Sequence, residues 1–188
     1  SGDAIGMDYY SGLGPIDPQV QRPGGGMVPA LGYLLQYDRL IQKAQKGKLT
    51  SAEITYLVAN FNPAELYRYE QARDHSIALL KEWLVKYKFK NWTRTETKGR
   101  RVTPAMRVKR AEQCARILQD TARWNSHGRG ISMEVLRRDV NLKVDDFAQD
   151  PDLRDRIRPY YRLVKDFMAR LGVSSVVHSH DFFTPLSR

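Results

Sequence analysis

The sequence predicts a predominantly helical chain with one or two short strands. From residue 30 onward, apolar residues recur at steps of three and four, the spacing that places them on one face of a helix. Residues typical of helix starts and ends separate these segments. Strand-like runs occur only near the two ends, at residues 4–7 and 173–177. These observations predict a helical chain with little β-sheet of its own.

The first 29 residues differ from the rest. Ala4–Met7 is a run of mostly small apolar residues, typical of a short buried strand that packs closely. Residues 9–29 are dense in glycine and proline and are predicted to be a loop. A single strand has no sheet, so we expect this chain to be the final part of something longer.

Helix starts are well marked. Thr50 and Glu53 form a capping-box pattern, and Asn62 precedes a proline at the first helical position. Pro159 should kink or restart the last helix, and Gly172 should end it. The apolar stripes, aromatic residues included, are expected to form the core. We expect helices over residues 30–46, 50–61, 62–87, 103–122, 132–140 and 150–172.

Composition narrows the function classes. The 188 residues are 41% hydrophobic and 28% charged, typical of a soluble globular protein, and no apolar run is long enough to span a membrane. The one cysteine, Cys114, cannot form an internal disulfide and is expected to be a reduced core thiol. The net charge of +10 permits anionic partners.

Most of this positive charge lies in one segment. Between Lys81 and Arg110 there are eleven Lys or Arg residues, opposed only by Glu82 and Glu96, with four aromatic residues among them. Cations neutralise phosphates and aromatic rings stack on bases, so the pattern suits nucleic acid. The alternative is a solvated connector with its aromatic residues turned inward. The candidate nucleic-acid contacts are Lys86, Lys88, Lys90, Arg94, Arg100 and Arg101.

The chain offers no complete catalytic set of its own. There is no Gly-x-Ser-x-Gly turn, and no base is evident for Cys114. No pair of histidines has the helical spacing of metal ligands, and His178 with His180 is interpreted as part of a polar terminus. His127 is interpreted as part of a structural turn. No metal and no cofactor are expected.

Two stretches carry a family resemblance. Residues 1–19, and Leu13-Gly-Pro-Ile-Asp-Pro-Gln19 in particular, closely resemble a segment of the serine dehydrogenase proteinase family. These proteins are relatives of SppA and ClpP and have the ClpP/crotonase fold. Arg123-Trp-Asn-Ser-His127 is similar to the family's Trp-Thr-His-Asp region, with one inserted residue and without the following Asp.

The resemblance implies an α/β ClpP/crotonase-like fragment in three parts. Residues 1–29 would end the core and supply a cleft loop, residues 30–142 would be the helical portion of the same domain, and residues 143–188 would be a C-terminal helical extension and tail. Members of this fold commonly form homo-oligomers. The compartment stays open between the cytoplasm and a membrane reached through a part that precedes Ser1, and the one unpaired cysteine favours a reducing compartment.

The implied activity is hydrolysis of peptide bonds through an acyl-enzyme. In the family, the nucleophilic serine precedes the segment that matches residues 1–8, so neither Ser1 nor Ser11 inherits this role, and the chain alone should be inactive. The SppA branch uses a lysine base, which burial must bring towards neutral pKa; Lys43, inside the predicted helix, is the candidate.

The same resemblance assigns the polypeptide substrate to the cleft loop, through Gly14, Pro15, Ile16 and Asp17. Two alternatives stay open. One is a basic helical module that binds nucleic acid through residues 81–110. The other is an inactive scaffold with the same fold.

Overall fold

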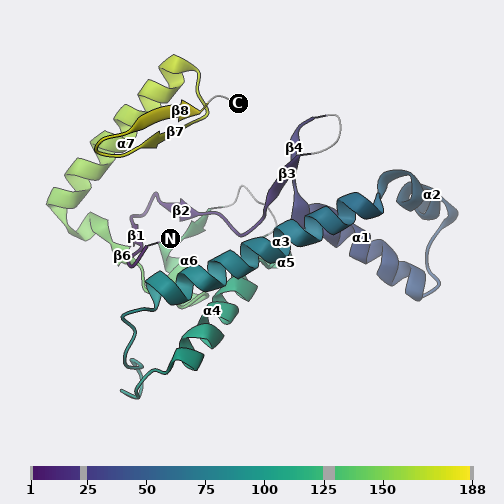
Figure 1. The fold of residues 1–188 in the computed structure, drawn as a ribbon, viewed down its shortest axis with the longest axis horizontal. Helices are drawn as coiled ribbons and strands as arrows, with labels where there is room; N and C mark the ends of the chain where they lie inside the picture. Colours follow the sequence, from purple (N-terminus) through teal and green to yellow (C-terminus); the bar gives the residue numbers. More distant parts are fainter. Residues whose placement is uncertain (1, 22–24, 125–129, 187–188) are drawn as a thin grey trace. The chain divides into compact units, whose positions relative to one another are not determined.

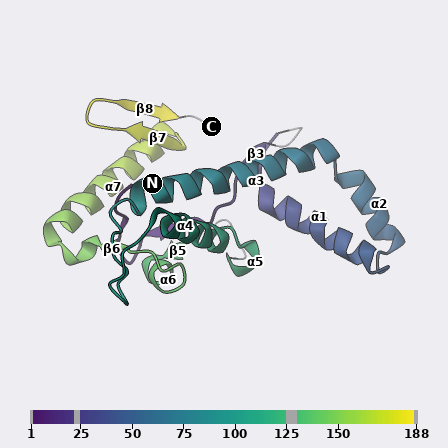
Figure 2. The same ribbon diagram turned by 60° about the horizontal axis from the view of Figure 1, so that its bottom comes forward.

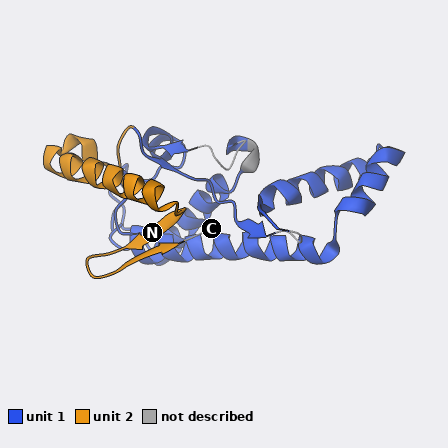
Figure 3. Cartoon of the chain, turned by 90° about the horizontal axis from the view of Figure 1, so that it is seen from above, with its two compact units in different colours: residues 1–5, 10–144 blue, residues 6–9, 145–188 orange. Residues whose placement is uncertain are grey.

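The computed structural model describes residues 2–21, 25–124 and 130–186. It divides the chain into two compact units (Figure 3). Unit 1 consists of residues 1–5 and 10–144, and unit 2 of residues 6–9 and 145–188. The three-part domain division and the ClpP/crotonase-like fold stay predictions.

The long helix α3 makes the main helix-to-helix contacts of unit 1 (Figures 1 and 2). Helices α1 and α4 both contact α3, and α2 follows α1 as a shorter arm. Ala30, Leu31 and Leu34 of α1 form a buried cluster with Tyr69 of α3. The helices are α1 (Ala30–Gln45), α2 (Ser51–Asn60), α3 (Pro63–Trp83), α4 (Pro104–Leu118), α5 (Thr121–Trp124) and α6 (Met133–Arg138).

The predicted helix starts are confirmed by their caps. The Thr50 hydroxyl accepts a hydrogen bond from the backbone N–H of Glu53, and the Glu53 carboxylate accepts one from the N–H of Thr50. The side chains of Asn62 and Thr103 accept backbone N–H groups at the starts of α3 and α4. These caps satisfy donors that a helix leaves unpaired, so short-range sequence determines where the helices begin.

The expected continuous helix over residues 62–87 is wrong at its end. The α-helix stops at Trp83, and η1 (Leu84–Lys88) is a π-helical turn. A π turn adds a residue to the turn and so rotates the side chains that follow it. Leu84 and Phe89 are buried, whereas Trp83, expected in the core, is 39% exposed.

Residues 9–29 are not only loop. Strand β2 (Gly12–Leu13) pairs antiparallel with β5 (Ile131–Ser132), and β3 (Gln19–Gln21) pairs antiparallel with β4 (Met27–Pro29). The dense glycine and proline keep these strands to two or three residues. The loop prediction missed them because their partners define them, not their own composition.

Unit 2 joins a short parallel strand pair to a helix and a hairpin. Strand β1 (Gly6–Met7) pairs with β6 (Asp145–Asp146), which confirms a short strand near the N-terminus. Of the predicted buried run 4–7 only Met7 is buried, so the expected burial of the whole run is wrong. After the 3₁₀ turn η2 (Phe147–Gln149) and helix α7 (Pro151–Leu171), β7 (Ser175–His178) pairs antiparallel with β8 (Phe183–Leu186). The predicted late strand is confirmed. The prediction of an irregular tail after it is wrong, because β8 pairs with β7 and completes a hairpin.

Helix α7 departs from two expectations. It runs through Pro159 as one helix, so the predicted restart is wrong, while Gly172 ends it in the left-handed conformation with φ of 65° as predicted. No residue of α7 is buried, although its apolar stripe was expected in the core. The hairpin covers only part of the stripe, with the ring centroid of Phe183 at 5.3 Å from that of Phe167, and Tyr161 is 62% exposed.

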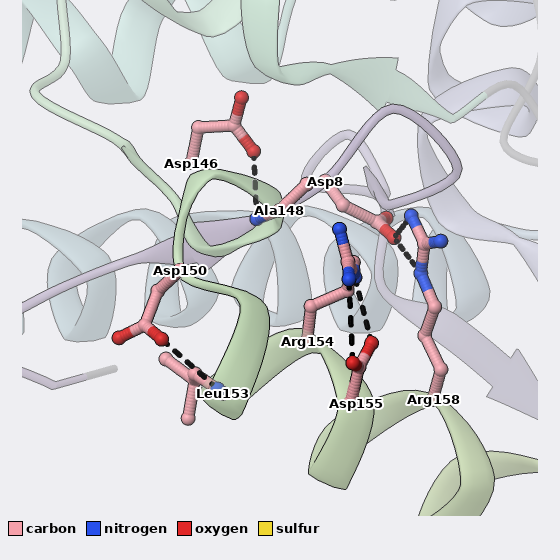
Figure 4. A network of polar contacts seen from close by, with 8 residues as sticks. All are labelled: Asp8, Asp146, Ala148, Asp150, Leu153, Arg154, Asp155 and Arg158. Atoms are coloured by element: carbon pink, nitrogen blue, oxygen red, sulfur yellow. Dashed lines mark hydrogen bonds and ion pairs between the residues drawn. The ribbon is translucent and has the colours of Figure 1, made fainter.

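A buried carboxylate ties β1 to α7 within unit 2 (Figure 4). The Asp8 side chain accepts hydrogen bonds from Nε and Nη2 of Arg158, at 3.1 and 2.9 Å. Asp8 is 5% exposed. At the start of α7, Asp150 accepts the backbone N–H of Leu153. The charge-assisted fork fixes the helix to a strand that is far away in sequence.

Cys114 is the core thiol that the sequence predicts. It is free and fully buried in α4, and its Sγ lies 3.9 Å from the carbonyl oxygen of Val140. Burial raises the pKa of the thiol, which disfavours the thiolate. Helices with both the length and the apolar composition to cross a membrane are absent from the described residues.

Candidate functional site

The predicted cleft segment, Gly14 to Asp17, is anchored to two helices of unit 1. Asp17 Oδ1 accepts the backbone N–H of Leu31 at 3.2 Å, and the carbonyl oxygen of Pro18 accepts the N–H of Ala30 at 2.9 Å. Helix α1 begins after Pro29, which has no side-chain cap, so these two groups satisfy its first donors. The N–H of Ile16 donates to the carbonyl oxygen of Leu118, at the end of α4.

The first residue of this segment faces open space. Gly14 is exposed, and a Cβ added there would meet nothing within 4 Å. Pro15, Ile16 and Asp17 are half-buried. The segment is therefore anchored at Asp17 and exposed at Gly14.

The β2–β5 pair brings together the neighbourhoods of the two segments that carry the family resemblance. A Cβ on Gly12 would lie 3.1 Å from the Cα of Gly130, a tight contact that the facing backbone would have to relieve by shifting. Trp124 is 6% exposed, and its indole N–H donates to the carbonyl oxygen of Ile117 at 2.8 Å. Arg123 pairs with Asp139 at 2.8 Å. His127 lies outside the described residues.

An open groove of about 590 Å³ lies beside the anchored segment. Leu31, which Asp17 caps, contributes to one wall, and Gln119 and Asp120, just after Leu118, contribute to another. Gly14 to Asp17 are not among the groove's lining residues; they are tied to its walls. The lining residues are Leu31, Leu35, Arg73, Asp74, Ile77, Arg116, Gln119 and Asp120.

Lys43 lies far along α1 from this segment. Thirteen residues separate it from Ala30, which is about 20 Å of helix. Its side chain is 54% exposed, and Nζ is 2.5 Å from Glu53 Oε1. The structure therefore gives Lys43 an ion-pair partner and not the burial that a lysine base needs. Its catalytic role stays a prediction.

The ion pair makes the stability of the α1–α2 corner depend on pH. The hydrogen bond from Lys43, with the Thr50 backbone N–H, lowers the pKa of Glu53 to about 2 from its usual 4.5. A lowered folded-state pKa contributes stability above the unfolded pKa, and this is lost as pH falls through the folded value. In urea unfolding, we expect wild type to exceed Glu53→Gln in stability at pH 6 and to lose this advantage between about pH 4.5 and 2. An advantage that is independent of pH would contradict the assignment.

The six predicted nucleic-acid contacts do not form one uniform surface. Lys90 pairs with Asp3, Lys88 is half-buried, and Lys86 Nζ lies 5.4 Å from the centroid of the adjacent Tyr87 ring. Arg94, Arg100 and Arg101 instead share a hairpin-like turn over residues 93–102. Lys98 on the same turn was not among the predicted contacts. The following Gly99 was the available signal, because it marks a tight turn.

The interleaved aromatic residues partly follow the inward alternative. Phe89 is 8% exposed, and its ring centroid is 5.8 Å from that of Trp92.

Among the tail residues, His180 Nδ1 contacts Asp181 and His178 Nδ1 contacts the Tyr160 hydroxyl. The described residues contain no group of three or more His, Cys, Asp or Glu placed to hold a metal ion.

Comparisons with protein-family models, with curated proteins and with solved structures found no match to this chain.

Proposed function

We propose that this chain is the C-terminal part of an SppA/ClpP-like serine peptidase and contributes its substrate cleft. The observation that carries the proposal is the β2–β5 pair. It joins the strand inside the family-like stretch 1–19 to the strand that follows the family-like stretch 123–127. The anchoring of Asp17 to α1, beside an open groove, is what a fixed cleft loop requires.

The reaction would be acyl transfer to a serine followed by hydrolysis. A serine Oγ attacks the scissile carbonyl, a base accepts its proton, and backbone N–H groups stabilise the oxyanion. The family resemblance assigns that serine to a turn before the segment matching residues 1–8. Residues 14–17 of this chain would hold the polypeptide in an extended form. Lys43 would act as the base only in a state that separates it from Glu53.

A serine-reactive fluorophosphonate probe tests this proposal on the complete gene product and on the 188-residue chain. We expect one labelled serine in the complete protein, N-terminal to the position of Ser1, and none in the chain alone. Lys43→Ala should abolish labelling, because the serine loses its base. Lys46→Ala and Lys48→Ala, in the same region, are the matched controls.

Glu53→Gln distinguishes loss of a catalytic base from loss of the ion pair. It breaks the Lys43–Glu53 ion pair but leaves the Lys43 amine in place. Retained labelling in Glu53→Gln with loss in Lys43→Ala supports the base. Equal loss in both variants contradicts it. No labelled serine in the complete protein would contradict the peptidase and favour an inactive scaffold.

A further inference from the structure

The turn over residues 93–102, here called the basic hairpin, has a fixed backbone. The N–H of Val102 donates to the carbonyl oxygen of Thr93, and the N–H of Thr95 to that of Arg100, both at 2.9 Å. The Thr95 hydroxyl accepts the N–H of Arg100 at 3.0 Å, and Gly99 makes the turn with φ of 58°. In Figures 1 and 2 this segment extends beyond the ends of α3 and α4, which it connects.

Four cations occupy this short hairpin, and Glu96 is its only acid. Arg94, Lys98, Arg100 and Arg101 are all exposed. Arg94 Nη1 donates to the carbonyl oxygen of Gly99 at 3.1 Å. Within the described part of the chain, none of the four has a carboxylate partner.

Several cations elsewhere have an acidic partner within the chain. Lys81 pairs with Glu112, and Arg123 and Arg138 both pair with Asp139, whose pKa these two arginines lower to about 2. In the basic hairpin, by contrast, Arg94 and Arg101 stand opposite each other in an antiparallel bridge. Like charges in this position destabilise a strand pair. An external anion would relieve that repulsion.

The chemistry of the hairpin favours nucleic acid over the other anionic partners. Its tip, Glu96-Thr-Lys-Gly99, has no apolar side chain to enter a lipid layer or to anchor a protein interface. Arginine forks match phosphate oxygens in geometry. Single strands are bound by stacking on exposed rings, but Phe89 is buried and Trp92 packs against it.

We propose that the basic hairpin binds the phosphates of duplex DNA. A two-stranded ribbon fits the B-form major groove, which is about 12 Å wide and 8.5 Å deep. The arms of the hairpin, residues 93–95 and 100–102, pair at a single bridge and extend about 10 Å, which exceeds the depth of this groove. The major groove of an RNA duplex is too narrow for this. The proposal is independent of the peptidase.

The test is fluorescence anisotropy of a short labelled DNA duplex with the 188-residue chain, repeated over a series of salt concentrations. The hairpin variant is Lys98→Gln, Arg100→Gln, Arg101→Gln, whose side chains make no hydrogen bond or ion pair within the described residues. We expect at least about a tenfold loss of affinity at low salt, and a salt slope shallower by about 0.9 for each phosphate contact removed.

The control variant, Arg156→Gln, Arg162→Gln, Lys165→Gln, removes the same charge from exposed positions of α7. It should bind within about twofold of wild type, because net charge contributes only long-range attraction. Equal losses in the two variants, or no duplex binding by wild type at low salt, would overturn the proposal. So would hairpin-dependent binding to phosphatidylserine vesicles, or to an RNA duplex or an acidic protein, without binding to the DNA duplex.

Discussion

Replacing Tyr69 with alanine is expected to lower the free energy of unfolding by about 3–5 kcal/mol, the usual cost of deleting a buried aromatic ring. Tyr69 is fully buried and packs edge-on against Tyr33, with ring centroids 4.7 Å apart. It also closes the cluster formed by Ala30, Leu31 and Leu34. The substitution therefore leaves a cavity between α1 and α3. Urea unfolding at neutral pH measures the loss.

Two variants make this result specific. Tyr67→Ala removes the same ring from a position of α3 that is 62% exposed, and we expect a change within about 0.5 kcal/mol. Tyr69→Phe keeps the ring but deletes a buried hydroxyl that has no hydrogen-bond partner among the described residues. We expect it to be neutral or stabilising, because an unsatisfied buried group carries a desolvation cost. A Tyr69→Ala protein as stable as Tyr67→Ala would show that this cluster is not a core.

Arg158→Ala is expected to destabilise unit 2 by about 2 kcal/mol, through the loss of charge-assisted hydrogen bonds to a buried carboxylate. Asp8 keeps its position directly after β1 but loses the guanidinium that compensates its burial. The Arg158 side chain is 38% exposed, which keeps the cost below that of a fully buried pair. Amide hydrogen exchange across α7 should become faster, because the helix loses its tie to the strand.

Arg162→Ala is the matched control, since it removes an exposed arginine one turn further along α7. Arg158→Lys keeps the charge and loses the two-pronged geometry, so it should fall between wild type and Arg158→Ala. Exchange in α7 that is the same for Arg158→Ala and Arg162→Ala would show that the Asp8 contact contributes no stability to this helix.

The sequence predicted best what short-range chemistry determines. Thr50, Asn62 and Thr103 cap helices through backbone groups two or three residues away, so their roles are visible in a short window. The π turn after Trp83 could not be predicted from the spacing of apolar residues. Leu84 and Phe89 are both buried although they lie five residues apart, which is not the spacing of one α-helical face. The strand pairs were also missed, since Gly12 meets Ser132 only in the folded chain.

For the candidate sites, residue types were predictable and partners were not. The excess of Lys and Arg located the basic segment, yet only the fold shows that Lys90 meets Asp3 while Arg94 meets Arg101. Asp17 was expected at a cleft. In the structure its carboxylate also accepts the backbone N–H of Leu31, fourteen residues later, and so caps the start of α1. Lys43 was chosen for its place in a helix, and its pairing with Glu53 depends on the turn into α2.

The close approach of Gly12 and Gly130 has a consequence for how this chain can diverge. A side chain at Gly12 would press on backbone of the opposite strand, which has little freedom to move. Position 12 therefore accepts a larger residue only if the facing backbone shifts, whereas a Cβ on Gly130 would meet the Cα of Gly12 at an ordinary 3.5 Å. A glycine two residues after a Tyr-Tyr, facing the residue that precedes an Ile-Ser, is thus a feature to seek in distant homologues whose other residues no longer align.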